Sequence, residues 1–307
     1  MSGAALAAAL REQLPVLDLR EWEPMDRHTT FRIGGRAELF CRPKGTEELR
    51  TVCRILKEKG VRPFVMGRGS NLLFGDGKLK GIVIQLAENQ GTIERLSERE
   101  LYAQAGATLV QLARTARDLG LSGLEFAGGI PGAVGGGIAM NAGAYGGEMK
   151  DVTAWVDVLD EQLEVRRLAP EDCDFSYRHS AFLDGEDIIL GAAFRLTPES
   201  GEVISQRMEE YKAKRVATQP LNYPSAGSTF KRPASGIAAK MIDEAGLKGY
   251  TVGGAQVSEK HAGFVINRGG ATCSDVLKLM DHVQAVVEER TGVRLEPEVR
   301  IVTELGE

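Results

Sequence analysis

The sequence predicts an α+β fold with two similar lobes followed by a C-terminal domain. A first observation is a repeated order, in which an amphipathic helix precedes a glycine-rich loop, within 46–73 and again within 108–147. A second is a change of pattern after Pro198, where a charged helix and a Gly/Pro-rich segment begin. A chain of 307 residues is long enough for two domains with sizeable cores. We predict one domain over 1–200, with lobes at about 17–85 and 86–200, and a second over 201–307.

Composition indicates a globular protein whose ligand is small. The chain is 43% hydrophobic and 26% charged, and its 38 basic and 43 acidic residues give a net charge of −5. That balance, with aromatic residues at 6%, argues against nucleic acid or an anionic membrane as the main partner. The four cysteines are far apart and form no CxxC pair, so we expect neither a zinc site nor a disulfide framework.

Two apolar stretches need an explanation other than a membrane. GAALAAAL near the N-terminus precedes Arg11 instead of following a basic segment, so we expect a short amphipathic helix and no signal peptide. The uncharged run 126–145 is about as long as a membrane span, but Pro131 and Asn141 interrupt it and it is mostly Gly and Ala. We expect a cytoplasmic protein without a membrane partner.

The first unit contains a helix over 46–60. Thr46 is expected to cap it, Leu49, Val52 and Leu56 share one face, and Gly60 ends it. The segment RPFVM then predicts a short strand, and GRGSNLL (67–73) predicts a loop rich in backbone donors.

The second unit repeats this order. Thr108 caps a helix with an apolar face that ends at Gly120, and the glycine-rich stretch 127–147 follows. Alternation over 152–167 predicts a hairpin, and DIILGAAFRL (187–196) predicts a strand.

The C-terminal domain is expected to start with a helix over 202–215. A Gly/Pro-rich segment (219–236), a helix ending at Gly246, a strand GFVIN and a long helix over 274–290 follow. The last residues alternate, which predicts a strand over 293–301 with Val293, Leu295, Val299 and Ile301 on one face. Pro297 makes it an edge or interrupted strand.

The glycine-rich loops indicate a phosphate-bearing ligand. The stretch 127–147 holds nine glycines and five alanines in 21 positions, and backbone N–H groups reach anionic oxygens most closely where no Cβ intervenes. Neither loop matches GxGxxG or a P-loop, so a Rossmann or P-loop assignment is excluded. By itself, GRGSNLL is equally well explained as a tight surface turn.

Polar residues near these loops have little specificity on their own. By spacing, Arg178 is best explained as a partner for Asp172 or Asp174, and Ser228 lies in a Gly/Pro turn without a GxSxG motif. The four histidines show no metal-ligand spacing. We therefore expect a cofactor to supply the chemistry.

Seven segments taken together are far more specific. In order they are TTFRIGG (29–35), GRGSNLL (67–73), AGGIPGAVGGGIAMNAGAYGGE (127–148), YRHS (177–180), YPSAGSTFKRP (223–233), GLKGYTVGGAQVSEKHAGFVIN (246–267) and LEPEVR (295–300). Over about 17–303 the sequence closely resembles the UDP-N-acetylenolpyruvoylglucosamine reductases, also called UDP-N-acetylmuramate dehydrogenases, of bacterial cell-wall synthesis.

The resemblance implies a non-covalent FAD between two lobes of the vanillyl-alcohol-oxidase (PCMH) type, and a third, α+β domain that binds the UDP-sugar. Carried over by motif, the cofactor contacts are Gly67, Arg68, Gly69, Ser70, Asn71, Gly129, Ile130, Pro131, Gly137, Asn141 and Gly143. No histidine lies in the glycine loops to tether flavin, which favours the reductase over the oxidases of that superfamily.

The resemblance also implies a reaction. NADPH reduces FAD and leaves, and UDP-N-acetylglucosamine enolpyruvate then takes hydride at its β-carbon. Arg178 would clamp the carboxylate on which charge builds, with Glu298 beside it, and Ser228 would donate the proton to the α-carbon, aided by Lys231.

Other implied positions are less closely defined. The residues expected near the sugar nucleotide are Lys231, Lys240, Gln256, His261 and Asn267, while Arg232 stands where one branch of the family has asparagine. Only 49 positions separate Arg178 from Ser228, too few for the tyrosine-bearing loop of longer members, so the chain resembles the shorter, type II form.

We therefore expect a monomeric FAD- and NADPH-dependent reductase with no nucleic-acid partner. Two alternatives remain at this stage: a flavin-dependent sugar or alcohol oxidase, which would consume oxygen without NADPH, and a non-catalytic nucleotide-sugar-binding protein. A non-catalytic protein would have no use for a proton donor such as Ser228.

Overall fold

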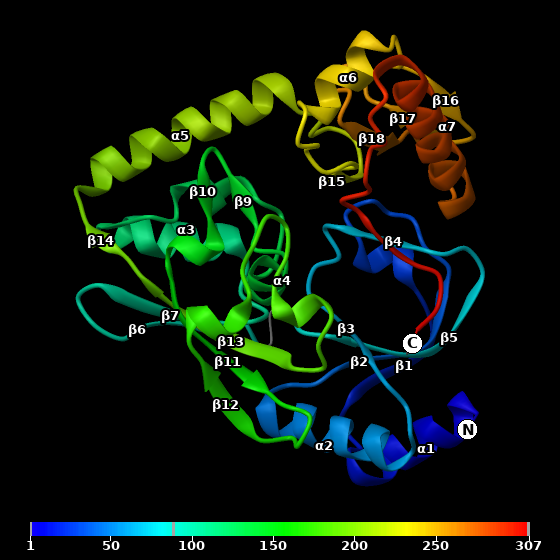
Figure 1. The fold of residues 1–307 in the computed structure, drawn as a ribbon. Helices are drawn as coiled ribbons and strands as arrows, with labels where there is room; N and C mark the ends of the chain where they lie inside the picture. Colours follow the sequence, from blue (N-terminus) through cyan, green and yellow to red (C-terminus); the bar gives the residue numbers. More distant parts are fainter. Residues whose placement is uncertain (1, 88–89, 306–307) are drawn as a thin grey trace.

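The computed structural model describes residues 2–87 and 90–305. Residues 1, 88, 89, 306 and 307, which fall within the predicted domain ranges, lie outside the described residues. Two sheet-based lobes lie side by side below a third, smaller unit, and the long helix α5 (Gly201–Thr218) crosses above the second lobe (Figure 1). The predicted α+β class, with two lobes and a C-terminal domain, is confirmed.

The first lobe has a four-stranded sheet in the order β1-β2-β5-β3. β1 is antiparallel to β2, whereas β5 runs parallel to both β2 and β3. Apolar residues of α1 and α2 pack in one core with those of β2 and β5. The elements are α1 (Gly3–Gln13), β1 (Asp18–Pro24), η1 (Met25–His28), β2 (Arg36–Arg42), α2 (Thr46–Glu58), β3 (Phe64–Met66), β4 (Leu72–Phe74) and β5 (Lys78–Gln85).

The start of α2 differs from the prediction. Thr46 is the first helical residue and Gly45 is the N-cap, with no side-chain cap. The carboxylate of Glu48 instead accepts a hydrogen bond from the Lys44 N–H. Acidic residues in the first turn complement the helix dipole, so the predicted helix forms although Thr46 does not cap it.

The second lobe has a five-stranded antiparallel sheet in the order β12-β11-β13-β7-β6. Thr108 caps α3 in a capping box with Gln111, as its position predicted. The sheet and helices are β6 (Ile93–Arg95), β7 (Glu100–Gln104), α3 (Leu109–Asp118), α4 (Val134–Ala139), β11 (Thr153–Leu159), β12 (Val165–Leu168) and β13 (Ile188–Arg195). Short elements connect them: β8 (Leu121–Ser122), η3 (Glu125–Gly129), β9 (Gly143–Ala144), β10 (Gly147–Glu148), η4 (Met149–Asp151), η5 (Pro170–Cys173), η6 (Ala181–Leu183) and β14 (Thr197–Pro198).

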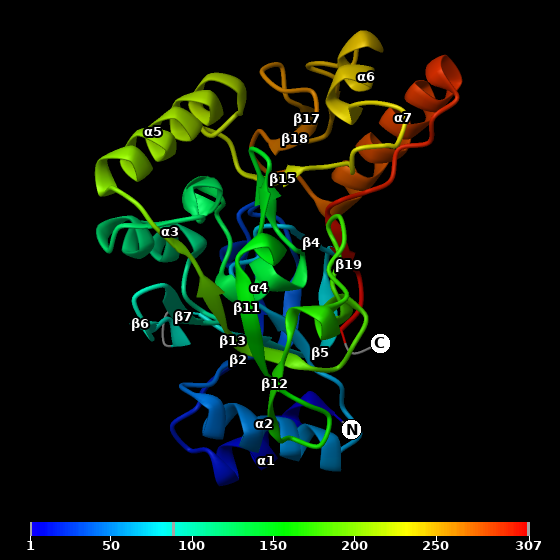
Figure 2. The ribbon, with the colours of Figure 1, turned by 60° about the vertical axis from the view of Figure 1, so that its left-hand side comes forward.

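The third unit is a sheet in the order β15-β18-β17-β16, with its own apolar core against α6 and α7. Figure 2 shows α6 on the side away from the lobes and α7 sloping down toward them, where the Cys273 and Ser274 N–H groups donate to the Asp76 carboxylate of the first lobe. Its elements are β15 (Ser225–Ser228), α6 (Ala238–Glu244), β16 (Thr251–Val252), β17 (Ala255–Val257), β18 (Phe264–Asn267) and α7 (Cys273–Thr291).

The C-terminal segment departs from the prediction and returns to the first lobe. Residues 293–299 form no regular strand, and only β19 (Arg300–Val302) does, parallel to β4. The segment first bonds to the third unit, where the Glu298 N–H donates to the Thr229 carbonyl, and then crosses so that the Arg300 N–H donates to the Asn71 carbonyl. Because it changes partner, one continuous apolar face is not formed, and Ile301 is 40% exposed.

Helix α5 packs against the second lobe, on η3 and α3. Ile204 is its buried residue, and Met208 packs on the core of the lobes. By packing, α5 therefore belongs with the lobe instead of the C-terminal domain. We propose that the boundary lies near 219 and not near 200.

Candidate functional site

Two glycine-rich loops from different lobes lie against each other. The first, 67–71, follows β3, and the second, 129–136, runs from η3 into α4. A Cβ built on Gly67 would be 3.0 Å from Ala133 Cβ, and one on Gly132 would be 3.5 Å from Ser70 Oγ. The structure thus brings together the loop residues that the sequence singled out. We name the two loops the glycine cradle.

Gly69 shows why this loop needs glycine. Its φ of +63° lies in the left-handed region, and a Cβ there would be 2.3 Å from the His28 carbonyl oxygen. The chain therefore turns tightly at Gly69. Within the described residues, the N–H groups of Ser70 and Asn71 that follow the turn donate to no protein acceptor.

Several of those N–H groups are ready to bind an anion. Within residues 2–87 and 90–305, the N–H groups of Gly69, Gly132 and Ala133 donate no hydrogen bond to protein although these residues are buried. The N–H groups of the half-buried Ser70 and Asn71 and of the exposed Gly136 likewise donate to no acceptor within the described residues. Buried unpaired amides are rare in native proteins, so several of them on two adjacent loops indicate a ligand with anionic oxygens. The diphosphate of FAD fits this donor set.

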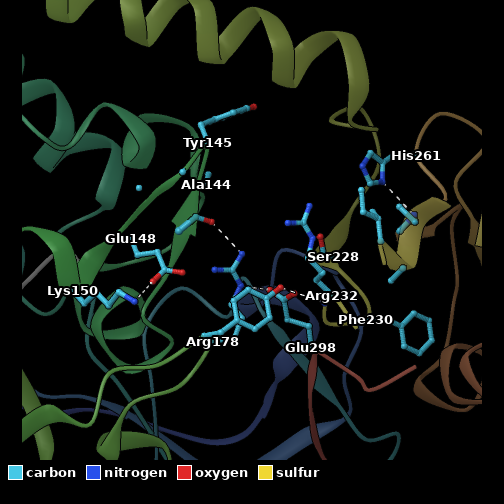
Figure 3. Close-up of a pocket in the computed structure, with 18 of the residues that line it drawn as sticks. Ala144, Tyr145, Glu148, Lys150, Arg178, Ser228, Phe230, Arg232, His261 and Glu298 are labelled. Carbon is cyan, nitrogen blue, oxygen red and sulfur yellow. Dashed lines mark hydrogen bonds and ion pairs between the residues drawn. The ribbon is translucent and has the colours of Figure 1, made fainter. Parts of the chain in front are cut away.

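A cavity of about 660 Å³ opens between the second lobe and the third unit. Arg178, Ser228 and Glu298 all line it (Figure 3). Arg178 Nε donates to Glu298 Oε1 at 2.7 Å, and Arg178 Nη2 donates to the Gly143 carbonyl at 3.1 Å. The local spacing favoured Asp172 or Asp174 as the partner of Arg178, and that interpretation is wrong.

Arg178 is held in an uncommon conformation. Its φ is +57°, in the left-handed region where residues other than glycine are unusual. Its turn is closed by hydrogen bonds between the backbones of Ser176 and His179. The Tyr177 hydroxyl also accepts a bond from the Arg232 N–H, which ties this turn to the loop after Ser228. Strain of this kind persists where the surroundings impose it, often at functional sites.

Glu298 faces the cavity from the point where the C-terminal segment crosses between units. Its carbonyl accepts from Asn71 Nδ2 at 3.0 Å, so the glycine cradle and the cavity share a rigid connection. Burial raises the pKa of the Glu298 carboxyl above its ordinary value of 4.5, while nearby Arg178 and Lys231 oppose that rise. The side chains of Arg178 and Glu298 are only 20% and 13% exposed, so solvent screens their attraction little.

Ser228 ends β15 beside Glu298. Gly227, with φ of +79°, makes the turn before it, and the hydrogen bond between Glu298 and Thr229 brings the two segments together. Within the described part of the chain, the Ser228 hydroxyl has no hydrogen-bond partner. A hydroxyl that faces a cavity without a protein partner is free to donate to a ligand.

Some residues of the cavity wall were missed. Tyr145, Glu148, Lys150, Tyr177, Phe230, Arg232 and Ile237 also line it. Their motifs were recognised, but adjacency within a motif does not say which side chains face inward. Tyr177 and Arg232 could have been found as immediate neighbours of the expected site residues Arg178 and Lys231.

Two expected cofactor contacts are directed elsewhere. Asn141 is fully buried, and its side-chain amide donates to Glu148 Oε2 and the Ser176 carbonyl while its oxygen accepts from the Lys150 N–H. Gly137 packs against the Leu109 side chain. Both are better explained as supports of the loop. Gly143 borders the cavity through its carbonyl, and the assignments of Gly67, Arg68, Gly69, Ser70, Asn71, Gly129, Ile130 and Pro131 remain predictions.

The expected substrate residues divide similarly. His261 lines the cavity, and burial lowers its pKa from the ordinary 6.5. Lys231, Lys240, Gln256 and Asn267 are not among the lining residues. Asn267 is 7% exposed and bonds to the Phe31 and Arg32 carbonyls, so it joins the third unit to the first lobe. Lys240 lies near Glu244 on the surface of α6, and Gln256 Nε2 bonds to the Gly249 carbonyl.

Other features limit the kinds of site present. Among residues 2–87 and 90–305, no group of three or more His, Cys, Asp or Glu side chains is placed to hold a metal ion. None of the described helices has the length and apolarity needed to cross a membrane.

Comparison with known proteins agrees with the geometry. Residues 37–169 match the family model of an FAD binding domain, and 219–302 match that of the UDP-N-acetylenolpyruvoylglucosamine reductase C-terminal domain. The reductase of Agathobacter rectalis is 47% identical over 96% of this chain and 98% of its own. That of Caldanaerobacter subterraneus is 47% identical over 92% and 93%. The crystal structure of the Thermus caldophilus reductase superposes with a TM-score of 0.80 at 34% identity, covering 93% of this chain and 98% of that one.

Fold and site together define an FAD-dependent oxidoreductase. The glycine cradle would hold the cofactor, and Arg178, Ser228 and Glu298 line the adjoining cavity. The chain belongs to the UDP-N-acetylenolpyruvoylglucosamine reductase family, as its motifs indicated.

Proposed function

We propose that the protein reduces UDP-N-acetylglucosamine enolpyruvate to UDP-N-acetylmuramate with NADPH, as a step in peptidoglycan precursor synthesis. The name of its relatives supports the substrate. The single observation that carries the proposal is the placement of Arg178, Glu298 and Ser228 on one cavity beside the glycine cradle.

Arg178 would hold the substrate carboxylate. A guanidinium has five N–H donors, of which Glu298 and the Gly143 carbonyl use two. The remaining donors can bind a carboxylate through two oxygens, and these bonds strengthen as negative charge develops during reduction. Glu298 fixes the direction of the guanidinium, because its Oε1 accepts from Nε.

Ser228 would supply the proton. Bound FAD supplies hydride equivalents, so reduction of the enolpyruvyl double bond needs hydride at one carbon and a proton at the other. The Ser228 hydroxyl can donate that proton to the α-carbon and regain one from solvent. Lys231 lies close enough to Glu298 to affect its pKa, and the same positive charge would favour the deprotonated serine.

The rest of the proposal concerns context. We propose that the protein acts as a monomer, since one chain provides all three of these residues. A need for NADPH would place the reaction in the cytoplasm, where that reductant is made.

Two half-reactions test the proposal. Anaerobic protein loaded with FAD should be reduced by NADPH and reoxidised by UDP-N-acetylglucosamine enolpyruvate, with one UDP-N-acetylmuramate formed per flavin. Rapid reoxidation by oxygen with no product from the enolpyruvyl sugar would instead favour an oxidase.

A further inference from the structure

One face of α5 is directed at the glycine-rich stretch. Ile204, Met208, Tyr211 and Arg215 are spaced by four, three and four residues, which places them on one side of a helix. A Cβ on Gly128 would be 2.8 Å from Met208 Cε, and the Tyr211 ring stacks on Tyr145 with centroids 4.5 Å apart. Arg215 therefore occupies a position on a packed face where an apolar residue would be expected.

Arg215 lies directly on the second loop of the glycine cradle. A Cβ built on Gly129 would be 3.2 Å from Arg215 Cδ and 3.4 Å from Nη1, so the side chain crosses this glycine closely. The absence of a side chain at Gly129 is what allows the guanidinium to reach the loop.

The guanidinium has no anionic partner in the protein. Among the described residues, no carboxylate lies within 4.0 Å of it and no side-chain hydrogen bond is made. Arg207 on the same helix differs, because it pairs with both Glu199 and Glu125. Burial lowers the pKa of the Arg215 guanidinium below its ordinary value, which reflects the cost of a half-buried unpaired charge. Proteins retain such groups where a ligand completes them.

We infer that Arg215 is a cationic contact for the negative charge of bound FAD. The inference rests on the FAD-binding fold and on the contact of Arg215 with Gly129. Gly129 lies within residues 37–169, which match the FAD binding domain. FAD offers two such charges: its diphosphate in every redox state, and the ring system when it is reduced. The amides of Gly132 and Ala133, three and four residues from Gly129, supply neutral donors but no formal charge.

The test compares Arg215→Met with Arg215→Lys and a control. Methionine keeps the packing on Gly129 and removes the charge, whereas lysine keeps the charge and loses the planar fork. Lys214→Met removes one charge from the adjacent, exposed position of α5. Apo-proteins are titrated with FAD and with riboflavin, which has no phosphate, and the midpoint potential of each bound flavin is measured. Thermal unfolding of the apo-proteins checks that all variants fold.

A contact to the diphosphate predicts that Arg215→Met weakens FAD binding about tenfold or more, with riboflavin binding unchanged. A contact to the reduced ring predicts a lower midpoint potential with little change in the affinity for oxidised FAD, because a cation favours the reduced anion. Arg215→Lys should retain part of the FAD affinity, or of the midpoint potential, that Arg215→Met loses. Lys214→Met should match the unmodified protein in both. Unchanged FAD affinity and unchanged potential in a folded Arg215→Met protein would overturn the inference, even if the KM for NADPH or the UDP-sugar rose.

Discussion

Arg178 and Glu298, 120 positions apart in the sequence, meet at 2.7 Å between Nε and Oε1. Their ion pair connects the turn after η5 with the crossing point of the C-terminal segment. Within the described residues, three of the five guanidinium N–H groups make no bond to protein, and Arg178 lines a cavity that Ser228 also lines. This arrangement and the glycine cradle beside it lead to five predictions.

Replacing Ser228 with alanine should separate the two half-reactions. Flavin reduction by NADPH should change little, because the hydroxyl has no role in it. Reoxidation by the enolpyruvyl sugar should slow by about 10²–10⁴-fold, the range for loss of a general acid. Stopped-flow absorbance measures both rates. Ser225→Ala, on the same strand but not on the cavity, is the matched control, and unchanged reoxidation in Ser228→Ala would remove Ser228 from the mechanism.

Arg178→Lys should also slow reoxidation, by about 10²–10³-fold, while FAD stays bound. Lysine carries the charge but cannot bind Glu298, the Gly143 carbonyl and a substrate carboxylate in one plane. Arg167→Lys alters an exposed pair with Asp157 and should behave like the unmodified protein. A lysine variant with normal reoxidation would show that positive charge alone is sufficient.

The rate of flavin reoxidation by the enolpyruvyl sugar should fall at acid pH. Because of Glu298, this fall should occur at a higher pH than an ordinary glutamate would produce. Burial raises its pKa above 4.5, so the carboxylate that holds Arg178 is lost as the pH falls through that raised value. Glu298→Gln should lower this rate at neutral pH and make it less dependent on pH in the acid range. The variant should still bind FAD. If the variant is purified without flavin, Glu298 has been placed in the wrong half of the site.

The effect of Glu298 on folding has the opposite sign. A carboxyl whose pKa is raised by folding binds protons more readily in the folded state. Its contribution to stability is therefore lost as the pH rises from 4.5 through the raised value. The glutamine variant should lack this loss, which thermal unfolding at several pH values can measure.

Gly136→Ala should test the cradle without disturbing the protein. A Cβ there meets no protein atom within 4 Å, and alanine favours the helix α4 by about 1 kcal/mol. We expect unchanged or higher stability of the apo-protein together with weaker FAD binding, since the methyl group enters the space left for the ligand. Gly45→Ala, which also meets nothing, is the control. Normal FAD affinity in Gly136→Ala would place the cofactor elsewhere.

The sequence predicted local features of the fold well, because caps and apolar spacing act within a few residues. Thr108 capped its helix as expected, and the two glycine loops were recognised from composition. The final strand was predicted too long. Residues 293–299 lie where the chain leaves the third unit for the first lobe, and an alternation of apolar and polar residues cannot indicate such a change of hydrogen-bond partner. The same limitation explains Arg178, whose nearest acidic residues in sequence were not its partner in space.

The candidate site was predictable only through ordered motifs. Motifs indicated Arg178, Ser228 and Glu298, and the structure places all three on one cavity. Asn141 and Asn267, which the motifs also indicated, have side-chain amides that bond backbone groups inside the protein, and their proposed ligand contacts stay predictions. An asparagine within a recognised motif can support a loop as well as bind a ligand, and burial, which spacing does not reveal, decides between these roles.

The most direct test of the central claim is the visible absorbance of the FAD-loaded protein, kept anaerobic, after NADPH and then UDP-N-acetylglucosamine enolpyruvate are added. The flavin band should bleach with NADPH and return only with the enolpyruvyl sugar. Bleaching followed by recovery with oxygen alone, and no response to the sugar, would contradict the proposed reaction.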